Sequence, residues 1–187
     1  MLELHLQHLH QLTNHARELI AHVFQHLDGL VAQLERQIRQ WAGKDEGSRR
    51  LQQIPGMGPM TASALSASVG NAHQFKDGRQ MSAWMGMVPR QHSSGGKSVL
   101  LGITKRGDKY LRTLLIHGAR SVLQAYQRNP AKMPASIQQL LQRKHPNVVC
   151  VALASHNVRV AWAMLSRGED YRTRSTATTP TLPAALA

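Results

Sequence analysis

The first 42 residues carry apolar side chains at a regular spacing. These apolar positions follow one another at intervals of three or four residues and are Leu9, Leu12, Ala16, Leu19, Val23, Leu27, Leu30, Leu34, Ile38 and Trp41. The spacing places them on one face of a helix and resembles the seam of a coiled coil. A helix of this length exceeds the usual range in globular proteins. The pattern therefore predicts a helix over 1–42 that packs either on the rest of the chain or on a second copy.

Beyond this helix the apolar positions form shorter groups, separated by polar and glycine-containing segments. Residues 43–48 are polar and include two glycines, which predicts a hinge. The groups that follow predict helices over 49–54, 60–69, 78–86, 109–127, 135–144 and 147–166, and a short strand over 99–103. The predicted fold class is mainly α: a long coiled-coil-like helix, then a compact helical domain with a helix-hairpin-helix and a Gly/Ser-rich loop.

The same pattern divides the chain into four parts. They are a coiled-coil or dimerisation helix (1–42), a central helix-hairpin-helix and serine-loop domain (49–128), C-terminal helices (129–168) and a tail (169–187). From residue 173 onward the tail is rich in Thr, Pro and Ala, so we expect it to be disordered.

The charge of the chain points to a nucleic-acid partner. Lys and Arg number 23 against 10 Asp and Glu, which gives a formal net charge of +13. Aromatic residues make up only 4% of the chain, so we do not expect a stacking platform for single-stranded bases to be the main binding device. Cys150 is the one cysteine, which excludes an internal disulfide framework. The sequence shows no signal peptide and no apolar run of ~18 residues, so we expect an intracellular protein without a membrane partner.

A first candidate motif is Ile-Pro-Gly-Met-Gly-Pro at residues 54–59, between two predicted short helices. This is the form of a helix-hairpin-helix, in which glycines permit a tight turn. Backbone N–H groups at the start of the second helix can then hold a DNA phosphate. The candidate DNA-binding residues are Gly56, Gly58 and Thr61. The alternative is an ordinary helix corner that packs in the core.

A second candidate is the pair Ser93-Ser94, followed by two glycines. A serine hydroxyl is a weak nucleophile and needs a neighbouring base or a cationic setting. His92 is the candidate base, and Arg90 and Lys97 are the candidate cations. A flexible loop has the same composition, so the motif by itself leaves both interpretations open.

A third candidate is a basic turn that leads into a helix. Lys105 and Arg106 precede Asp108, a good N-cap residue, and Arg112 follows one helical turn later. Cations near a helix N-terminus suit an anionic ligand. We therefore take Lys105, Arg106 and Arg112 as candidate DNA-binding residues, with a solvated basic turn as the alternative.

Together, and in this order, the three motifs resemble the C-terminal domain of bacterial transposases of the insertion sequence one-ten family. Within it they look most like the branch named for insertion sequence eleven-eleven. The resemblance covers about residues 51–122 and includes the Ile-Pro-Gly-x-Gly turn, a Gly-x-Val-Pro element, the Ser-Gly pair and the Lys-Arg-Gly…Leu-Arg helix start. It implies that the serine before the glycine, Ser94, is the nucleophile, with Ser93 as its neighbour. It also implies an N-terminal resolvase-type acidic domain and a noncoding bridge RNA.

The sequence departs from that family in one respect, because it begins at the long helix and does not include the acidic domain. Its ten carboxylates are scattered, and no pair presents itself as a metal site. His22 and His26 have a metal-ligand spacing, but a His-rich solvent face is the simpler interpretation. We therefore expect no metal or other cofactor in this chain, and a divalent metal such as Mg²⁺ only in the acidic domain.

Two functional hypotheses follow. The favoured one is the DNA-binding, serine-bearing part of a transposase or recombinase, incomplete by itself and located in the bacterial cytoplasm with the nucleoid. The alternative is a non-catalytic DNA- or RNA-binding, or regulatory dimerisation, fragment. The expected partners are double-stranded DNA, a guide RNA, and further copies of the chain in a homodimer or higher oligomer.

Overall fold

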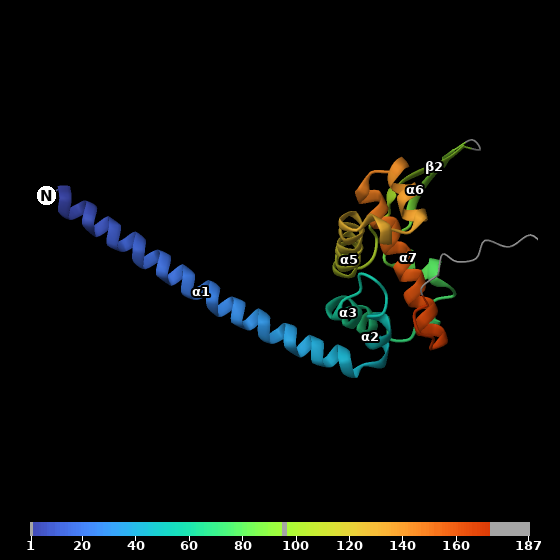
Figure 1. Ribbon diagram of the computed structural model, residues 1–187, viewed down its shortest axis with the longest axis horizontal. Coiled ribbons are helices and arrows are strands. Elements are labelled where there is room, and N and C mark those ends of the chain that lie inside the picture. Colours follow the sequence, from blue (N-terminus) through green and yellow to red (C-terminus); the bar gives the residue numbers. More distant parts are fainter. Residues whose placement is uncertain (1, 95–96, 173–187) are drawn as a thin grey trace, which may run out of the picture. The chain divides into compact units, whose positions relative to one another are not determined.

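The computed structural model describes residues 2–94 and 97–172 (Figure 1). Within this part, the side chains of residues 2–12 and 92–100 lie outside the description. The chain divides into two compact units, Met1–Trp41 and Ala42–Ala187. The predicted disorder of the tail concerns residues that lie largely outside the described part.

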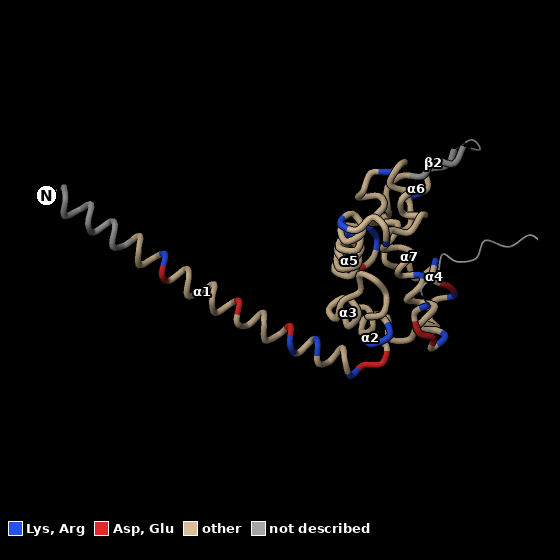
Figure 2. The backbone as a smooth tube through the Cα atoms, in the orientation of Figure 1, with Lys and Arg blue, Asp and Glu red and all other residues tan. Residues whose placement is uncertain are grey.

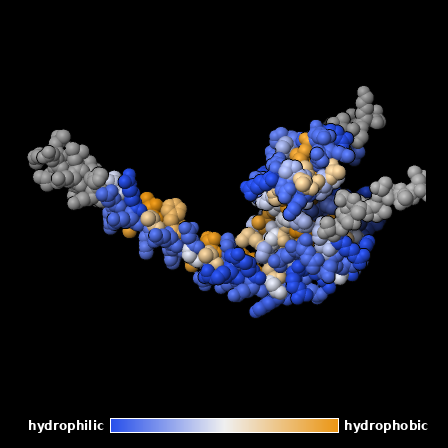
Figure 3. Space-filling model, viewed as in Figure 1, coloured by the Kyte–Doolittle hydropathy of each residue, from blue (hydrophilic) through white to orange (hydrophobic). Residues whose placement is uncertain are grey.

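The first unit is a single helix. Helix α1 spans Leu2–Lys44, as the apolar spacing predicts. Between residues 13 and 34 the positions of its stripe are exposed: Leu19 is 55% exposed and Leu34 is 58% exposed. Figure 3 shows apolar patches at the surface of α1, and Figure 2 shows that the helix carries both signs of charge. The stripe thus remains an apolar surface without a partner inside this unit.

Most of the segment over 43–48, which the sequence predicts as a hinge, is helical. Helix α1 continues to Lys44, and α2 (Glu46–Leu51) begins after a single non-helical residue, Asp45. The Asp45 carboxylate accepts hydrogen bonds from Ser48 N at 2.7 Å and from Ser66 Oγ at 2.8 Å. The polar stretch therefore contains the N-cap of α2. The predicted helix over 49–54 correspondingly begins and ends three residues earlier.

The remaining helices lie close to the predicted ranges. They are α3 (Pro59–Val69), α4 (Gly78–Trp84), α5 (Lys109–Arg128), α6 (Ala135–Arg143) and α7 (Pro146–Arg167), with short 3-10 turns at Ala72–Gln74 and Pro130–Lys132. Asp108 caps α5 as predicted, because its Oδ1 accepts from Leu111 N at 2.9 Å. The mainly α fold class is confirmed.

Helix α7 lies at the centre of the second unit, where it packs on both α4 and α5. Its core face carries Ala154, Val158 and Ala161, all fully buried. By length and composition alone α7 could cross a membrane, but its packing gives a different reason for that composition: it is the core helix of this unit. Asn157 Nδ2 also donates to Pro55 O at 2.9 Å, which ties α7 to the turn before α3.

The segment between α4 and α5 forms an antiparallel hairpin rather than a loop with one strand. Strand β1 (Pro89–Ser94) pairs with β2 (Lys97–Ile103), from Pro89 opposite Ile103 to Ser94 opposite Lys97. The predicted strand over 99–103 is part of β2. Strand β1 was not predicted, because its sequence Pro-Arg-Gln-His-Ser-Ser has no apolar alternation.

Candidate active site

The base of the hairpin is formed by two backbone segments that cross in close contact. Lys105 N donates to Gly86 O at 3.0 Å, and Thr104 N donates to Val88 O at 2.9 Å. Gly86 has φ +69° and Gly107 has φ +88°. A Cβ at Gly86 would lie 1.8 Å from Arg106 O, and a Cβ at Gly107 would lie 1.9 Å from Trp84 O. Only glycine fits at either position, so the crossing is fixed by sequence.

Arg112 fastens this crossing. Its Nη1 donates to Met85 O at 3.1 Å and to Arg106 O at 3.3 Å, and lies 3.5 Å from Asp108 O. The side chain therefore joins the end of α4 to the turn before α5. The sequence indicated Arg112 as a phosphate ligand, whereas the structure turns this nitrogen toward backbone carbonyl groups.

Ser94 is the last residue of β1, at the end of the hairpin away from the crossing. Its register partner is Lys97, while Ser93 lies opposite Ser98 and His92 opposite Val99. The side chains of these residues lie outside the described part, so the structure places them by backbone register alone. Ser94 and Lys97 are thus brought together at one end of the ladder.

The basic turn lies at the other end of the hairpin. Lys105 and Arg106 are exposed and follow β2, beyond the pair formed by Pro89 and Ile103. At ~3.3 Å per residue, the strand from Pro89 to Ser94 extends over roughly 17 Å. Arg90 lies on β1 between the two ends and is exposed. The candidate cations are therefore spread along the hairpin rather than gathered at Ser94.

The helix-hairpin-helix residues differ in what they contact. Gly56 has φ +88°, and its carbonyl oxygen would lie 1.9 Å from a Cβ at Gly118 of α5. Thr61 is buried. Gly58 is exposed, and a Cβ there would meet nothing within 4 Å. The turn therefore packs on α5 through Gly56, while Gly58 leaves the first turn of α3 open to a ligand.

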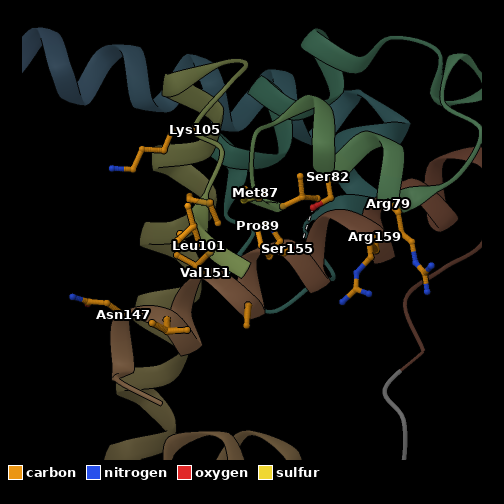
Figure 4. Close-up of a pocket in the computed structure, with 15 residues that line it drawn as sticks. Arg79, Ser82, Met87, Pro89, Leu101, Lys105, Asn147, Val151, Ser155 and Arg159 are labelled. Carbon is orange, nitrogen blue, oxygen red and sulfur yellow. Dashed lines mark hydrogen bonds between the residues drawn. The ribbon is translucent and has the colours of Figure 1, made fainter. Parts of the chain in front are cut away.

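A pocket of about 680 Å³ lies beside the crossing, between the base of the hairpin and α7 (Figure 4). We call it the α7 pocket. Lys105 lines one side, and Arg79 and Arg159 line the other. Between them, Ser82 Oγ and Ser155 Oγ form a hydrogen bond of 2.9 Å.

Sequence analysis did not identify the α7 pocket, because its lining comes from three segments far apart in the chain. One signal was available in α7, which carries a second stripe at helical spacing beside its core face. That stripe is Val148, Val151, Ala152, Ser155 and Arg159. Among the described residues, no group of three or more His, Cys, Asp or Glu side chains comes together in a way that could hold a metal ion.

Comparison with known proteins bears directly on these motifs. Residues 48–134 match the model of the Transposase IS116/IS110/IS902 family. The chain is 51% identical over 148 residues to a probable family 20 transposase of Pseudomonas aeruginosa, covering 79% of this chain and 44% of that protein. It is 48% identical over 145 residues to the transposase for insertion sequence element IS1111A of Coxiella burnetii, covering 78% of this chain and 40% of that protein.

A third relative is the transposase for insertion sequence element IS1328 of Yersinia enterocolitica. It is 38% identical over 162 residues, which cover 85% of this chain and 48% of that protein. The chain therefore spans less than half the length of each of these curated relatives.

Proposed function

The chain belongs to the IS116/IS110/IS902 transposase family, and on this premise we propose that it is the serine-bearing part of an enzyme that cuts and rejoins DNA. Ser94 is the proposed nucleophile. The chain acts together with an N-terminal acidic domain and a guide RNA, both of which the family resemblance implies. Double-stranded DNA is the substrate.

The observation that carries the proposal is the fixed base of the β1–β2 hairpin. A nucleophile works best when its approach to the reacting atom is set in advance. β1 begins at Pro89, directly after the crossing that Gly86, Gly107 and Arg112 hold together. The serine pair thus stands at the end of an arm whose attachment to the core has little freedom.

In the proposed reaction, Ser94 Oγ attacks the phosphorus of one phosphodiester. A phosphoserine ester forms, and the bond between phosphorus and one bridging sugar oxygen breaks. The serine proton passes to a base, for which His92 on the same strand is the candidate, and the leaving oxygen takes up a proton to become a hydroxyl. A hydroxyl of another strand then attacks the phosphoserine, releases the serine and restores a phosphodiester.

The cations have separate proposed roles along the hairpin. Lys97 is the register partner of Ser94, so it is the proposed electrostatic partner of the reacting phosphate. Arg90, Lys105 and Arg106 hold flanking phosphates, together with the first turn of α3 at Gly58. Any divalent metal belongs to the acidic domain of the longer protein, and none of the steps above passes through it.

The proposal is tested by looking for a covalent protein–DNA adduct. The chain is combined with the N-terminal part of the Pseudomonas aeruginosa relative, a guide RNA and end-labelled DNA, and the products are separated under denaturing conditions. Ser94→Ala should abolish the adduct while DNA binding persists, because a hydroxyl contributes little to charge. The matched variant Ser93→Ala should still form the adduct.

Two results would change the account. Loss of the adduct in Ser93→Ala alone moves the nucleophile by one residue. Adduct formation that neither substitution affects overturns the serine mechanism, and the chain is then a non-catalytic DNA-binding fragment.

A further inference from the structure

Arg79 and Arg159 come from different helices but lie side by side at one end of the α7 pocket (Figure 4). The packing of α4 on α7 places them there, because a Cβ at Gly78 would lie 2.9 Å from Arg159 Cα. Both side chains are exposed and extend toward the same side of the pocket. The two positive charges are thus held close together by backbone packing.

Among the residues that the structure describes, no acidic side chain lines this pocket. Arg79, Lys105 and Arg159 are its charged lining residues. Asp77, beside Arg79 in the chain, already accepts a hydrogen bond from Gln80 N at 2.8 Å as the cap of α4. Like charges held together repel each other, so this arrangement favours an anionic ligand.

The ion pairs of the chain and the lowered pKa of His156 agree with an anionic ligand at this pocket. Within the described part of the chain, the ion pairs join Arg39 to Glu35 and Arg50 to Glu46, and none of these residues lines the pocket. Burial, and then the positive charge of Arg159, lower the pKa of His156. The described residues therefore supply no ion pair that neutralises the charge at this end of the pocket.

The wall between the cations is apolar and open to solvent. Leu101 is 45% exposed and Val148 is 51% exposed, and Ile103 and Val151 are partly exposed beside them. A small inorganic anion would use the arginines and leave this wall in water. A volume of about 680 Å³ lies within the range of pockets that enclose whole organic ligands. A ligand that uses both the cations and the apolar wall carries phosphates and also has flat, weakly polar faces.

We infer that the α7 pocket binds unpaired nucleotides of a DNA strand. Arg79 and Arg159 contact its phosphates, and the aliphatic wall contacts base faces and the methyl group of thymine. A duplex hides its base faces in the stack, so only an unpaired segment can use the wall. The inference rests on the proposed function, since it assumes that the chain acts on DNA, and it adds a binding site at the base of the hairpin, at the opposite end from Ser94.

The test measures binding of the whole chain to a labelled oligothymidylate, to an oligouridylate of the same length and to a duplex, over a range of salt concentrations. Arg79→Ala combined with Arg159→Ala should lower the slope of log K against log salt for the single strand by about 1.4, since each phosphate contact contributes about 0.7. Arg128→Ala combined with Arg143→Ala removes the same charge from exposed helix ends outside the pocket. This control should leave the slope nearly unchanged.

A second variant fills the pocket without changing its charge. Ala152 is exposed and lines the pocket, so Ala152→Trp occupies the space while α7 remains helical. We expect roughly tenfold weaker binding of the oligothymidylate, about 1.4 kcal/mol, with duplex binding unchanged.

Three results would overturn the inference: no effect of Ala152→Trp, equal losses for single strand and duplex, or a loss confined to an oligouridylate. If the wild-type chain binds the duplex and the pocket variants behave like it, only this inference fails. A wild-type chain that binds neither probe contradicts the proposed function as well.

Discussion

Helix α1 and the compact unit that follows it use apolar side chains in opposite ways. In α1 the stripe is exposed between residues 13 and 34, with Val23 at 56% and Leu27 at 48%. In the compact unit, Leu65, Met81 and Leu111 are 1% exposed or less. Each leucine or valine that stays exposed on the stripe forgoes the favourable free energy that burial would give, roughly 1.5–3 kcal/mol for each side chain. The α1 stripe therefore has no partner surface within its own unit, whereas the compact unit buries its apolar side chains against one another.

Two glycines make the same comparison at the level of single atoms. Gly29 lies inside α1, and a Cβ there would meet nothing within 4 Å. Gly118 lies inside α5, and a Cβ there would lie 1.9 Å from Gly56 O. No packing contact thus requires a glycine at position 29 of α1, whereas close packing on Gly56 requires one at position 118 of α5. Helical spacing alone does not distinguish the two cases.

The largest expected effect concerns assembly through α1. Leu27→Asp combined with Leu34→Asp places two charges on the stripe, and self-association should be lost completely because charges are costly to bury. Sedimentation of the whole chain measures the mass. Gln25→Asp combined with Ala32→Asp adds the same charge to the opposite face of the helix and should leave the assembly intact. A monomeric wild-type chain, or equal masses for the two double variants, would refute assembly through the stripe.

The next effect separates the two glycines. Gly118→Ala should destabilise the compact unit by about 3 kcal/mol or more, because the added Cβ overlaps the Gly56 carbonyl and the turn must move. Gly29→Ala should instead stabilise α1 by about 1 kcal/mol, from helix propensity alone. Denaturant unfolding monitored by circular dichroism measures both. If the free energy of unfolding rose in both variants, or fell in both, the distinction between the two regions would be wrong.

A smaller effect concerns Arg112, a cation of the compact unit that donates to backbone carbonyl groups. Arg112→Ala should cost about 2 kcal/mol of stability, because charge-assisted hydrogen bonds to Met85 O and Arg106 O are lost. The slope of log K against log salt for duplex DNA should not change. Lys105→Ala, at an exposed position, should lower that slope by about 0.9. Equal decreases in both variants would return Arg112 to the DNA interface.

The smallest effect lies at the junction after α1. Asp45→Ala removes the cap of α2 and should cost about 1 kcal/mol at neutral pH. The hydrogen bond from the Ser48 backbone lowers the pKa of the Asp45 carboxyl. Because the folded pKa lies below the unfolded one, this stability is present above the usual value near 3.8 and is lost as the pH falls through the folded pKa. The difference between wild type and variant should therefore shrink in acid. A difference that is constant with pH would show that the carboxylate does not act as a cap.

Much of the helical framework could be predicted from local signals. Asp108 marks the start of α5, Pro146 the start of α7, and Gly168 its end, each through the chemistry of helix termini. Asp45 carries the same N-cap signal for α2, but the glycines on either side of it favour a hinge in the sequence analysis. Capping residues are therefore as informative in polar stretches as beside apolar ones.

The site was harder to predict, because its parts depend on contacts between distant segments. β1 has no apolar alternation and exists as a strand through its pairing with β2. The sequence indicates Arg112 as a free cation at a helix start, and only the fold shows that the end of α4 lies beside it. The α7 pocket brings Arg79 and Arg159 together across 80 residues of sequence. The resemblance to a known family, rather than spacing, selected Ser94.

The central claim is that Ser94 forms a covalent bond with DNA, and the most direct measurement locates that bond. The adduct formed with the N-terminal part of the relative is digested with protease and nuclease, and the modified peptide is sequenced by mass spectrometry. The account predicts a nucleotide phosphate on Ser94 and on no other residue. A nucleotide phosphate on Ser93, on a tyrosine, or on the N-terminal part alone would contradict it.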